Sequence, residues 1–467
     1  MFGRTFILRR SSCKGYFYAC LILSSTTGNN YYFLIEVLLT GFPIIIVILI
    51  NIKGVKRILL KNVILVNDFA YTNGGASKVA IIDSLELAKR GYNVTLFSSV
   101  GPVEEDLNNE QNIRVICLDK YDILHNPNRI EAIKEGIWNR ESKKEVKDIL
   151  KRFNHTNTVV HIHSVSKSLS SSVIREVIEQ GYHVVYHIHD FGIACPNLGF
   201  YNYQKQKICT LKAMSFKCLC TNCDSRAYSH KIWRVIRQFV QEQFGLLPKG
   251  VKHFIAVSNF SHKILEQYIP KNAKVHLIHN PINVDQRDFG EREIGNYFIF
   301  VGRLSKEKDP ITPAIAAKKL GVPIMFVGDG ELKEEIKKVN EDAEVLGWLP
   351  NDKVIEHIRK ARALIMSSRL YETQGMVVSE AMACGVPAIV AETSAATEFI
   401  INGKTGLTFK TGDSNDLADK MNKLLDHDLV FQMSQLAFET YWRNPSTIER
   451  HIDSLIKLYE EVLNEGD

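Results

Sequence analysis

The chain has 467 residues, of which 24% are charged and 45% hydrophobic, as in ordinary globular proteins. This composition excludes a collagen-like, a fully disordered or a multi-span membrane protein, and the length predicts two or three domains. The net charge is +6, but residues 1–61 hold eight Lys and Arg against one Glu, so the remainder is nearly neutral. A nearly neutral body argues against nucleic acid as a partner. Any attraction to an acidic membrane surface lies at the N-terminus.

An apolar stretch near the N-terminus, residues 31–52, is just long enough for a membrane helix. Glu36 and Pro43 weaken that interpretation, because a carboxylate is costly in lipid and proline kinks a helix. The next Met after Met1 is Met214, so a wrongly assigned start is an equal alternative. We therefore treat residues 1–58 as an extension, either a membrane anchor or a mis-assigned start. The protein is expected in the cytoplasm, at the inner face of the membrane if the stretch inserts.

After the extension, short apolar runs alternate with amphipathic helical segments, a pattern typical of parallel sheets covered on both faces. The first series of predicted strands is 63–66, 93–97, 113–117, 158–161, 184–188, 254–257 and 275–278. The second series is 297–301, 324–327, 344–346, 363–366 and 388–390. The sequence thus predicts an α/β protein of two Rossmann-like, doubly wound domains, 59–280 and 281–440, facing across a cleft. A helix over 441–467 is expected to pack back on the first domain.

Two glutamates, Glu372 and Glu380, mark the cleft side of the second domain. Strand 363–366 precedes them, and a helix is predicted over 377–383. The backbone N–H groups of Gly375, Met376 and Val377 then lie at a helix N-terminus, which favours an anion such as a diphosphate. The two carboxylates are placed to accept hydrogen bonds from the hydroxyls of a sugar and a ribose. A solvated surface pair is the competing interpretation, which the small and apolar neighbours disfavour.

Basic and aromatic residues follow other strands of the second domain. Arg303 and Lys308 come after strand 297–301 and could neutralise a leaving diphosphate without a metal, although a solvated basic loop is the alternative. Gly328 follows the next strand in a glycine turn and is a further candidate for a nucleobase contact. Trp348 and Leu349 follow the strand after that and could flank a nucleobase. No cofactor is expected for catalysis.

In the first domain, Gly74 and Gly75 open the first helix, where glycine lets the backbone approach a phosphate closely. The six-residue dinucleotide fingerprint and the P-loop lysine are both missing from this stretch, which disfavours a nicotinamide cofactor. Two histidine pairs end neighbouring strands, and their loop-end members are His163 and His189. These two are candidate catalytic residues, with packed, hydrogen-bonded histidines as an equal alternative.

Five of the nine cysteines lie within residues 195–223. Cys220 and Cys223 have the spacing of metal ligands, and Cys195 and Cys209 could complete a four-thiolate zinc site, with Cys218 as a substitute for Cys220. Disulfides and free thiols are the alternatives, and an iron–sulfur centre is less favoured than zinc. This insertion follows His189 and therefore borders the expected cleft.

From about residue 62 to its end the chain resembles glycosyltransferase family 4. The resemblance rests on the glycine loop at 74–75, on the Gly-Arg-Leu…Glu-Lys stretch at 302–308, and on Glu372 with Glu380. It implies the GT-B fold and a retaining enzyme that moves a sugar from a UDP- or GDP-sugar to a glycan or lipid-linked glycan. Surface polysaccharide synthesis is the expected setting. The first domain would then bind the acceptor and the second the donor.

The resemblance also implies roles for single residues. Arg303 and Lys308 would bind the donor diphosphate, Glu372 the donor sugar and Glu380 the ribose. Residues 375–377 would supply backbone donors, Gly75 would close over the phosphates, and His163 would lie at the junction of donor and acceptor. Many members have Gly-Phe-Gly where this chain has Thr-Gln-Gly at 373–375, so the preference for a donor sugar stays open.

Two rival functions stay open at this stage. A nucleotide-sugar epimerase on the same fold would work without an acceptor. A non-catalytic nucleotide-sugar-binding partner of another transferase should have lost the donor-site cations or carboxylates. This chain keeps both kinds of side chain, which favours an active enzyme.

Overall fold

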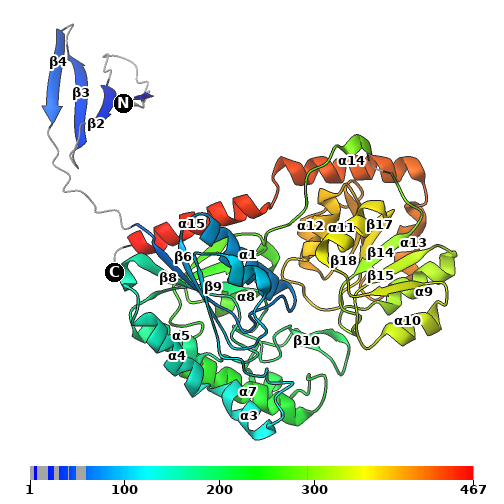
Figure 1. Cartoon of the computed structure of the whole chain (residues 1–467). Helices are drawn as coiled ribbons and strands as arrows, with labels where there is room; N and C mark the ends of the chain where they lie inside the picture. Colours follow the sequence, from blue (N-terminus) through cyan, green and yellow to red (C-terminus); the bar gives the residue numbers. More distant parts are fainter. Residues whose placement is uncertain are drawn as a thin grey trace. The chain divides into compact units, whose positions relative to one another are not determined.

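The computed structural model describes residues 5–7, 19–25, 31–39, 42–48, 59–291 and 293–465. The chain divides into two units, Met1–Ile58 and Leu59–Asp467 (Figure 1). The smaller unit contains a four-stranded antiparallel sheet in the order β1-β2-β3-β4. Its strands are β1 (Thr5–Ile7), β2 (Ala19–Ser25), β3 (Tyr31–Leu39) and β4 (Phe42–Ile48).

The expectation of a membrane helix over residues 31–52 is wrong for the part of that stretch that is described. Strands β3 and β4 pair there instead, with Leu39 opposite Phe42. The run of Ile and Val at 44–48 favours extended backbone, and Pro43 is tolerated because β4 is an edge strand. Among the described residues, no helix combines the length and apolar character needed to cross a membrane. The rest of the predicted extension lies outside the described residues.

The larger unit begins with a seven-stranded parallel sheet in the order β13-β12-β9-β8-β5-β6-β7, which defines its N-terminal domain. The strands are β5 (Asn62–Val66), β6 (Asn93–Ser98), β7 (Ile113–Cys117), β8 (Thr158–Ile162), β9 (His183–Ile188), β12 (His253–Ala256) and β13 (Lys274–Leu277). A short hairpin, β10 (Tyr201–Asn202) with β11 (Lys207–Ile208), lies inside the cysteine-rich insertion.

A six-stranded parallel sheet in the order β16-β15-β14-β17-β18-β19 defines the C-terminal domain. Its strands are β14 (Phe298–Val301), β15 (Ile324–Val327), β16 (Glu344–Gly347), β17 (Ala363–Met366), β18 (Ala388–Ala391) and β19 (Gly406–Phe409). The predicted α/β class with two doubly wound domains is confirmed. Strand β19 was not predicted, since its sequence GLTF lacks a longer apolar run.

Helices connect the strands and cover the two sheets (Figure 1). In the N-terminal domain they are α1 (Gly75–Lys89), α2 (Glu105–Asn109), α3 (Arg129–Ile137), α4 (Arg140–Leu150), α5 (Ser172–Glu179), α6 (Phe216–Cys220), α7 (Tyr228–Gln243) and α8 (Asn259–Leu265). In the C-terminal domain and the tail they are α9 (Ile311–Leu320), α10 (Lys333–Val339), α11 (Asn351–Lys360), α12 (Met376–Ala383), α13 (Ser414–Lys423), α14 (His427–Arg443) and α15 (Ile448–Asn464).

Fully buried apolar strand residues form the core of each domain. Ile64, Val160 and Phe254 lie in the N-terminal core, and Phe298 and Phe326 lie in the C-terminal core. Strands that are buried on both faces read as continuous apolar runs, which is why the sequence located them. The loops that follow these strands carry the polar residues of the site.

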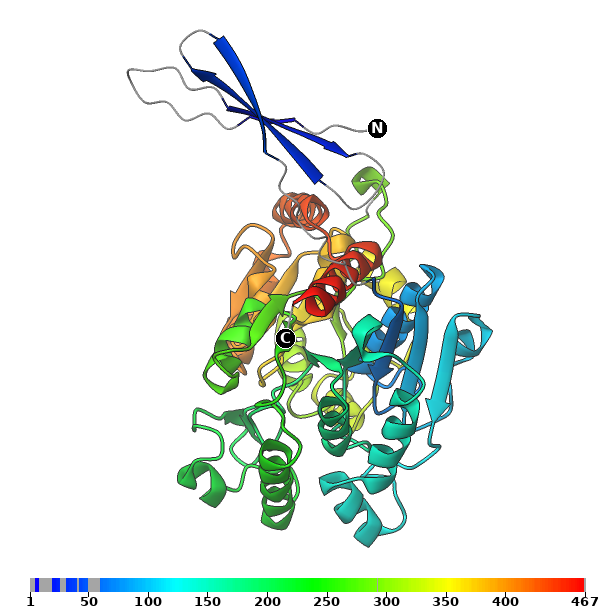
Figure 2. The same ribbon diagram turned by 90° about the vertical axis from the view of Figure 1, so that its left-hand side faces the viewer.

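The last two helices connect the domains. Helix α14 packs on α12, and the Trp442 indole donates a hydrogen bond to the Ala383 carbonyl (3.0 Å). Helix α15, red in Figures 1 and 2, then lies against α1 and β8 of the N-terminal domain. The Tyr459 hydroxyl there forms a hydrogen bond of 2.6 Å with His161 Nδ1. The C-terminal helix α15 therefore packs against the N-terminal domain.

Tyr459→Phe is expected to lower the free energy of unfolding by about 1–3 kcal/mol, because it leaves a buried histidine nitrogen without its partner. Both Tyr459 and His161 are fully buried. Tyr201→Phe is the matched control, since the Tyr201 hydroxyl is buried and no described residue forms a hydrogen bond with it. Chemical denaturation should show a lower free energy of unfolding for Tyr459→Phe and an unchanged one for Tyr201→Phe. Equal effects of the two substitutions would contradict this account of α15.

Candidate functional site

A cavity of about 310 Å³ lies where the carboxyl ends of the two sheets face each other. The N-terminal domain contributes the start of α1, the end of β9 and the loop after β13. The C-terminal domain contributes the loops after β14 and β17 and the start of α12. The lining residues are Gly75, Ala76, His189, Asn280, Phe300, Val301, Lys308, Met366, Ser368, Glu372, Thr373, Gln374, Gly375, Met376 and Val377.

The start of α12 forms one wall of this cavity. Gly375 is its N-cap and has φ of +81°, a left-handed conformation that side chains rarely adopt. A Cβ at Gly375 would lie 2.7 Å from the Ala396 side chain and 3.0 Å from Cε of Met366. Only glycine therefore fits at this position. The backbone N–H groups at the start of the helix have no carbonyl partner within the helix, and they lie at its positive end.

Glu372 lies on the same wall as an acceptor held in place by two donors. Its Oε1 is 2.5 Å from Nζ of Lys308 and 2.6 Å from the Ser368 hydroxyl. Its side chain is 14% exposed, against 31% for that of Lys308. The carboxylate is thus largely desolvated and oriented, while the ammonium keeps contact with solvent.

Glu380 lies one turn along α12, outside the lining of the cavity, and contacts the other domain. Its Oε1 is 3.4 Å from Nζ of Lys78, which also donates to Oδ1 of Asn351 at 2.7 Å. Lys78 belongs to α1, so this pair joins α1 of the N-terminal domain to α12 of the C-terminal domain. Sequence reasoning missed Lys78, although a cation in the first turn of a helix that opens on the cleft was a usable signal.

The sequence Thr373-Gln374 makes further contacts across the cleft. The Thr373 hydroxyl donates to the His189 carbonyl (3.1 Å), and the Thr373 carbonyl accepts from the Ser258 hydroxyl (2.5 Å). Gln374 is buried, and its Oε1 accepts from the backbone N–H of Asn280 (2.8 Å). The residues at which the chain departs from the family pattern therefore connect the two domains.

The two candidate catalytic histidines differ in position. His189 lines the cavity, and burial lowers its pKa to about 3, which keeps its ring neutral. His163 is buried behind it and does not line the cavity; its Nδ1 is 3.0 Å from Nε2 of His189. Burial also lowers the pKa of His163 well below its usual value. Only His189 of this pair can touch a molecule in the cavity.

Several predicted site residues lie outside the cavity lining. Arg303 is exposed, and the Trp348 side chain is 73% exposed. Gly328 and Leu349 are half-buried and also lie away from the lining. Gly74 has φ of +98° and directly precedes the lining residue Gly75. The structure thus brings together Gly75, Lys308, Glu372, His189 and residues 375–377, and places the predicted nucleobase contacts beyond them.

A second cavity of about 270 Å³ adjoins the first and shares the wall formed by His189, Glu372 and Thr373. Lys167, Arg234 and the cysteine-rich insertion line its other sides. The lining residues are Lys167, His189, Asp190, Phe191, Asn197, Leu198, Gly199, Tyr203, Ser225, Arg234, Leu370, Tyr371, Glu372 and Thr373. Two ligands could therefore meet at one wall.

The cysteine-rich insertion gathers its thiols around a lysine. Cys195, Cys218 and Cys223 are buried, Cys209 is half-buried and Cys220 is exposed. Lys231 is fully buried and its Nζ lies 3.5 Å from Sγ of Cys218. The thiols do not converge as tightly as metal ligands do. In the described part of the chain, the group whose ligand atoms all lie within 4.8 Å of one another is a histidine cluster instead.

Two family models match consecutive parts of the chain. Glycosyltransferase Family 4 matches residues 73–286, and Glycosyl transferases group 1 matches residues 282–440. An uncharacterized glycosyltransferase of Methanocaldococcus jannaschii is 30% identical over 179 residues, 37% of this chain and 50% of that protein. The N-acetyl-alpha-D-glucosaminyl L-malate synthase of Bacillus anthracis is 24% identical over 242 residues, 47% of this chain and 63% of that protein. The matches therefore span less than two thirds of these relatives.

Solved structures share the fold at low sequence identity. A glycosyltransferase from Rickettsia africae aligns with a TM-score of 0.61 at 17% identity, over 87% of this chain and 100% of that one. Sucrose-phosphate synthase from Thermosynechococcus elongatus aligns with a TM-score of 0.62 at 16% identity, over 87% and 100%. The two matched models cover both domains, and the chain belongs to the family 4 type of glycosyltransferases with the GT-B fold.

Proposed function

We propose that this chain is a retaining glycosyltransferase that moves a sugar from a UDP- or GDP-sugar to a glycan or lipid-linked glycan, in surface polysaccharide synthesis. The observation that carries the proposal is the shared wall between the two cavities. Donor and acceptor could meet at Glu372, His189 and Thr373, each from its own side. A structure of HepE from Anabaena in complex with UDP and glucose has the same fold, with a TM-score of 0.59 at 14% identity over 86% of this chain and 100% of that one.

In this proposal the donor lies in the larger cavity. Its diphosphate accepts hydrogen bonds from the backbone N–H groups at 375–377 and pairs with Lys308, with Arg303 as a second cation from the same loop after β14. The sugar hydroxyls donate to Glu372, and the ribose hydroxyls donate to Glu380. Charge that develops on the leaving phosphate is stabilised by these fixed donors, so the chain's own residues suffice for that step.

The acceptor then enters from the smaller cavity. Its attacking hydroxyl reaches the donor across the shared wall, where the neutral ring of His189 can accept or donate a hydrogen bond. The leaving phosphate takes the proton of that hydroxyl. Lys167, Arg234 and Asp190 line this cavity, so it offers both cations and a carboxylate to the polar groups of an acceptor.

The proposed nucleobase site involves Gly328, Trp348 and Leu349. These residues lie beyond the ends of β15 and β16, outside the cavity lining. The base would extend over them from the ribose held by Glu380. Association with an acidic membrane surface through the basic residues of 1–61 stays a prediction, as does a cytoplasmic location.

The function is tested by following nucleotide release from a panel of UDP- and GDP-sugars with the full-length protein. Slow release without acceptor, accelerated by one class of glycan or lipid-linked glycan, is the expected result, together with transfer of the sugar with its anomeric configuration kept. An epimerase would change the sugar without releasing nucleotide. Folded protein that neither binds nor cleaves any nucleotide sugar would contradict the proposal and favour a non-catalytic partner.

We further propose that the insertion binds a structural zinc through Cys195, Cys209, Cys218 and Cys223. Burial favours Cys218 over the exposed Cys220. Burial raises the pKa of the Cys195 thiol to about 11, and backbone hydrogen bonds from Phe200 and Asn197 offset only part of that rise, so the ion itself would have to displace the proton. The sulfurs would have to draw together around the ion, and Lys231 would then neutralise part of the thiolate charge.

A further inference from the structure

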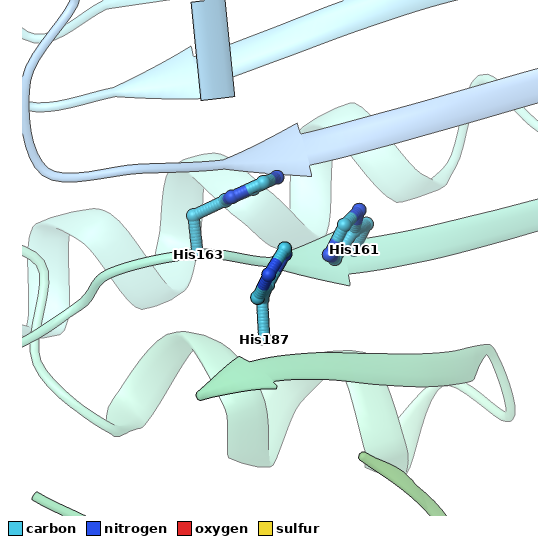
Figure 3. Close-up of side chains that lie close together, drawn as sticks. All are labelled: His161, His163 and His187. Atoms are coloured by element: carbon cyan, nitrogen blue, oxygen red, sulfur yellow. The ribbon is translucent and has the colours of Figure 1, made fainter. Parts of the chain in front are cut away.

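A cluster of histidines lies in the interior of the N-terminal domain, behind the donor cavity. His161 lies on β8, His163 directly follows it, and His187 lies on the neighbouring strand β9. Residues two apart on a strand share a face, so these rings project to the same side of the sheet. Figure 3 shows the three side chains gathered between the ends of the two strands. Their ring centroids are 4.1–5.3 Å apart.

The cluster contains buried polar atoms that have no hydrogen-bond partner among the residues that the structure describes. They are Nε2 of His161, Nε2 of His163, both ring nitrogens of His187 and Oδ2 of Asp83, which lies on α1. The three histidines offer ligand atoms that all lie within 4.8 Å of one another. Oδ2 of Asp83 lies 3.5 Å from Nε2 of His163. All four side chains are buried, and an unpaired polar atom is destabilising there.

In His161, His163 and Asp83, the second polar atom of the side chain already forms a hydrogen bond. Nδ1 of His161 bonds to the Tyr459 hydroxyl (2.6 Å), and Nδ1 of His163 bonds to Nε2 of His189 (3.0 Å). Oδ1 of Asp83 bonds to Nε2 of His451 (2.9 Å). Metal-binding side chains typically have this arrangement, one atom toward the ion and the other toward a partner that fixes the ring.

We propose that His161, His163, His187 and Asp83 bind one divalent transition metal ion. Three imidazoles and one carboxylate suit zinc in a tetrahedral site. The ion would satisfy the unpaired nitrogens and the unpaired carboxylate oxygen together. None of the four residues lines either cavity, so the ion has a structural role. It joins β8 and β9 to α1, and the partners Tyr459 and His451 extend that connection to α15.

Metal analysis of full-length protein, purified without an affinity tag or metal resin, tests the site. Wild-type protein is expected to contain about one more equivalent of metal per chain than His187→Gln, in keeping with one ion per site. His276→Gln is the matched control, because His276 is a half-buried strand histidine that contacts His253 outside the cluster. Equal metal content in wild type and His187→Gln would overturn the proposal, since water would then satisfy these atoms.

Cobalt binding to metal-depleted wild-type protein keeps the test valid if His187→Gln fails to fold. A site of nitrogen and oxygen ligands gives tetrahedral cobalt absorption without a thiolate charge-transfer band. This absorption is expected to persist in Cys218→Ser, which removes a ligand of the proposed cysteine site alone. Absorption with the thiolate band only, or no cobalt uptake at all, would overturn the histidine site.

Discussion

Glu380→Ala is expected to weaken the binding of a nucleotide sugar about 10- to 100-fold. Hydrogen bonds to a charged group contribute about 1.5–3 kcal/mol each, and about 1.4 kcal/mol corresponds to a factor of ten in affinity. The Glu380 carboxylate is 8% exposed, so bulk water would not replace it as the acceptor for ribose hydroxyls. Isothermal titration with the donor identified by the release assay gives the affinity directly.

The control for this substitution is Glu392→Ala. Glu392 follows β18 in the same domain, and its side chain is exposed and outside both cavities. The substitution Glu392→Ala should leave the affinity for the nucleotide sugar unchanged. Lys78 keeps its bond to Asn351 when the Glu380 carboxylate is removed, and the contacts of Thr373 and Gln374 with the N-terminal domain do not involve Glu380. Unchanged donor affinity in Glu380→Ala would mean that the ribose binds elsewhere.

Glu372→Gln is expected to lower kcat/KM about 100- to 1000-fold, the range found when one oriented group that acts on the transition state is removed. The amide has nearly the volume of the carboxylate and can keep the bond from Ser368. It loses the charge that pairs with Lys308 at 2.5 Å. The donor sugar would then be held less firmly as its bond to the nucleotide breaks. Steady-state rates measured at saturating donor separate this effect from weaker binding.

Glu307→Gln is the matched control for that experiment, because Glu307 lies beside Lys308 in sequence but does not line either cavity. The double variant Glu372→Gln with Lys308→Met should lose less than the product of the two single losses, since the two side chains contact each other. Strict multiplicativity, or full activity in Glu372→Gln, would contradict the role of this pair.

The sequence alone predicts those features of the fold and of the candidate site that depend on local residue patterns. Strands buried on both faces appear as apolar runs, and Gly375 marks the start of α12 because only glycine fits its left-handed backbone. Glu372 was found because it follows a strand and precedes that glycine. Both residues line the larger cavity, while their contacts with a ligand stay proposals.

The remaining contacts depend on chain packing that no local pattern encodes. Lys78 meets Glu380 across 302 positions of sequence. His163 and His189 have the same place in their motifs, and only the packing of the finished domain buries one and leaves the other at the cavity. Residues 31–52 were ambiguous because a run of Ile and Val suits both a membrane helix and a strand.

Hydrogen–deuterium exchange tests the central claim, that the start of α12 and the loop before it bind the donor. The exchange of amides at 372–377 would be compared with and without a saturating nucleotide sugar in wild-type protein. The account predicts slower exchange at 375–377, where the backbone N–H groups would bond to phosphate oxygens, and little change at β6 and β7, far from the cavity. Protection elsewhere in the chain, with unchanged exchange at 375–377, would contradict it.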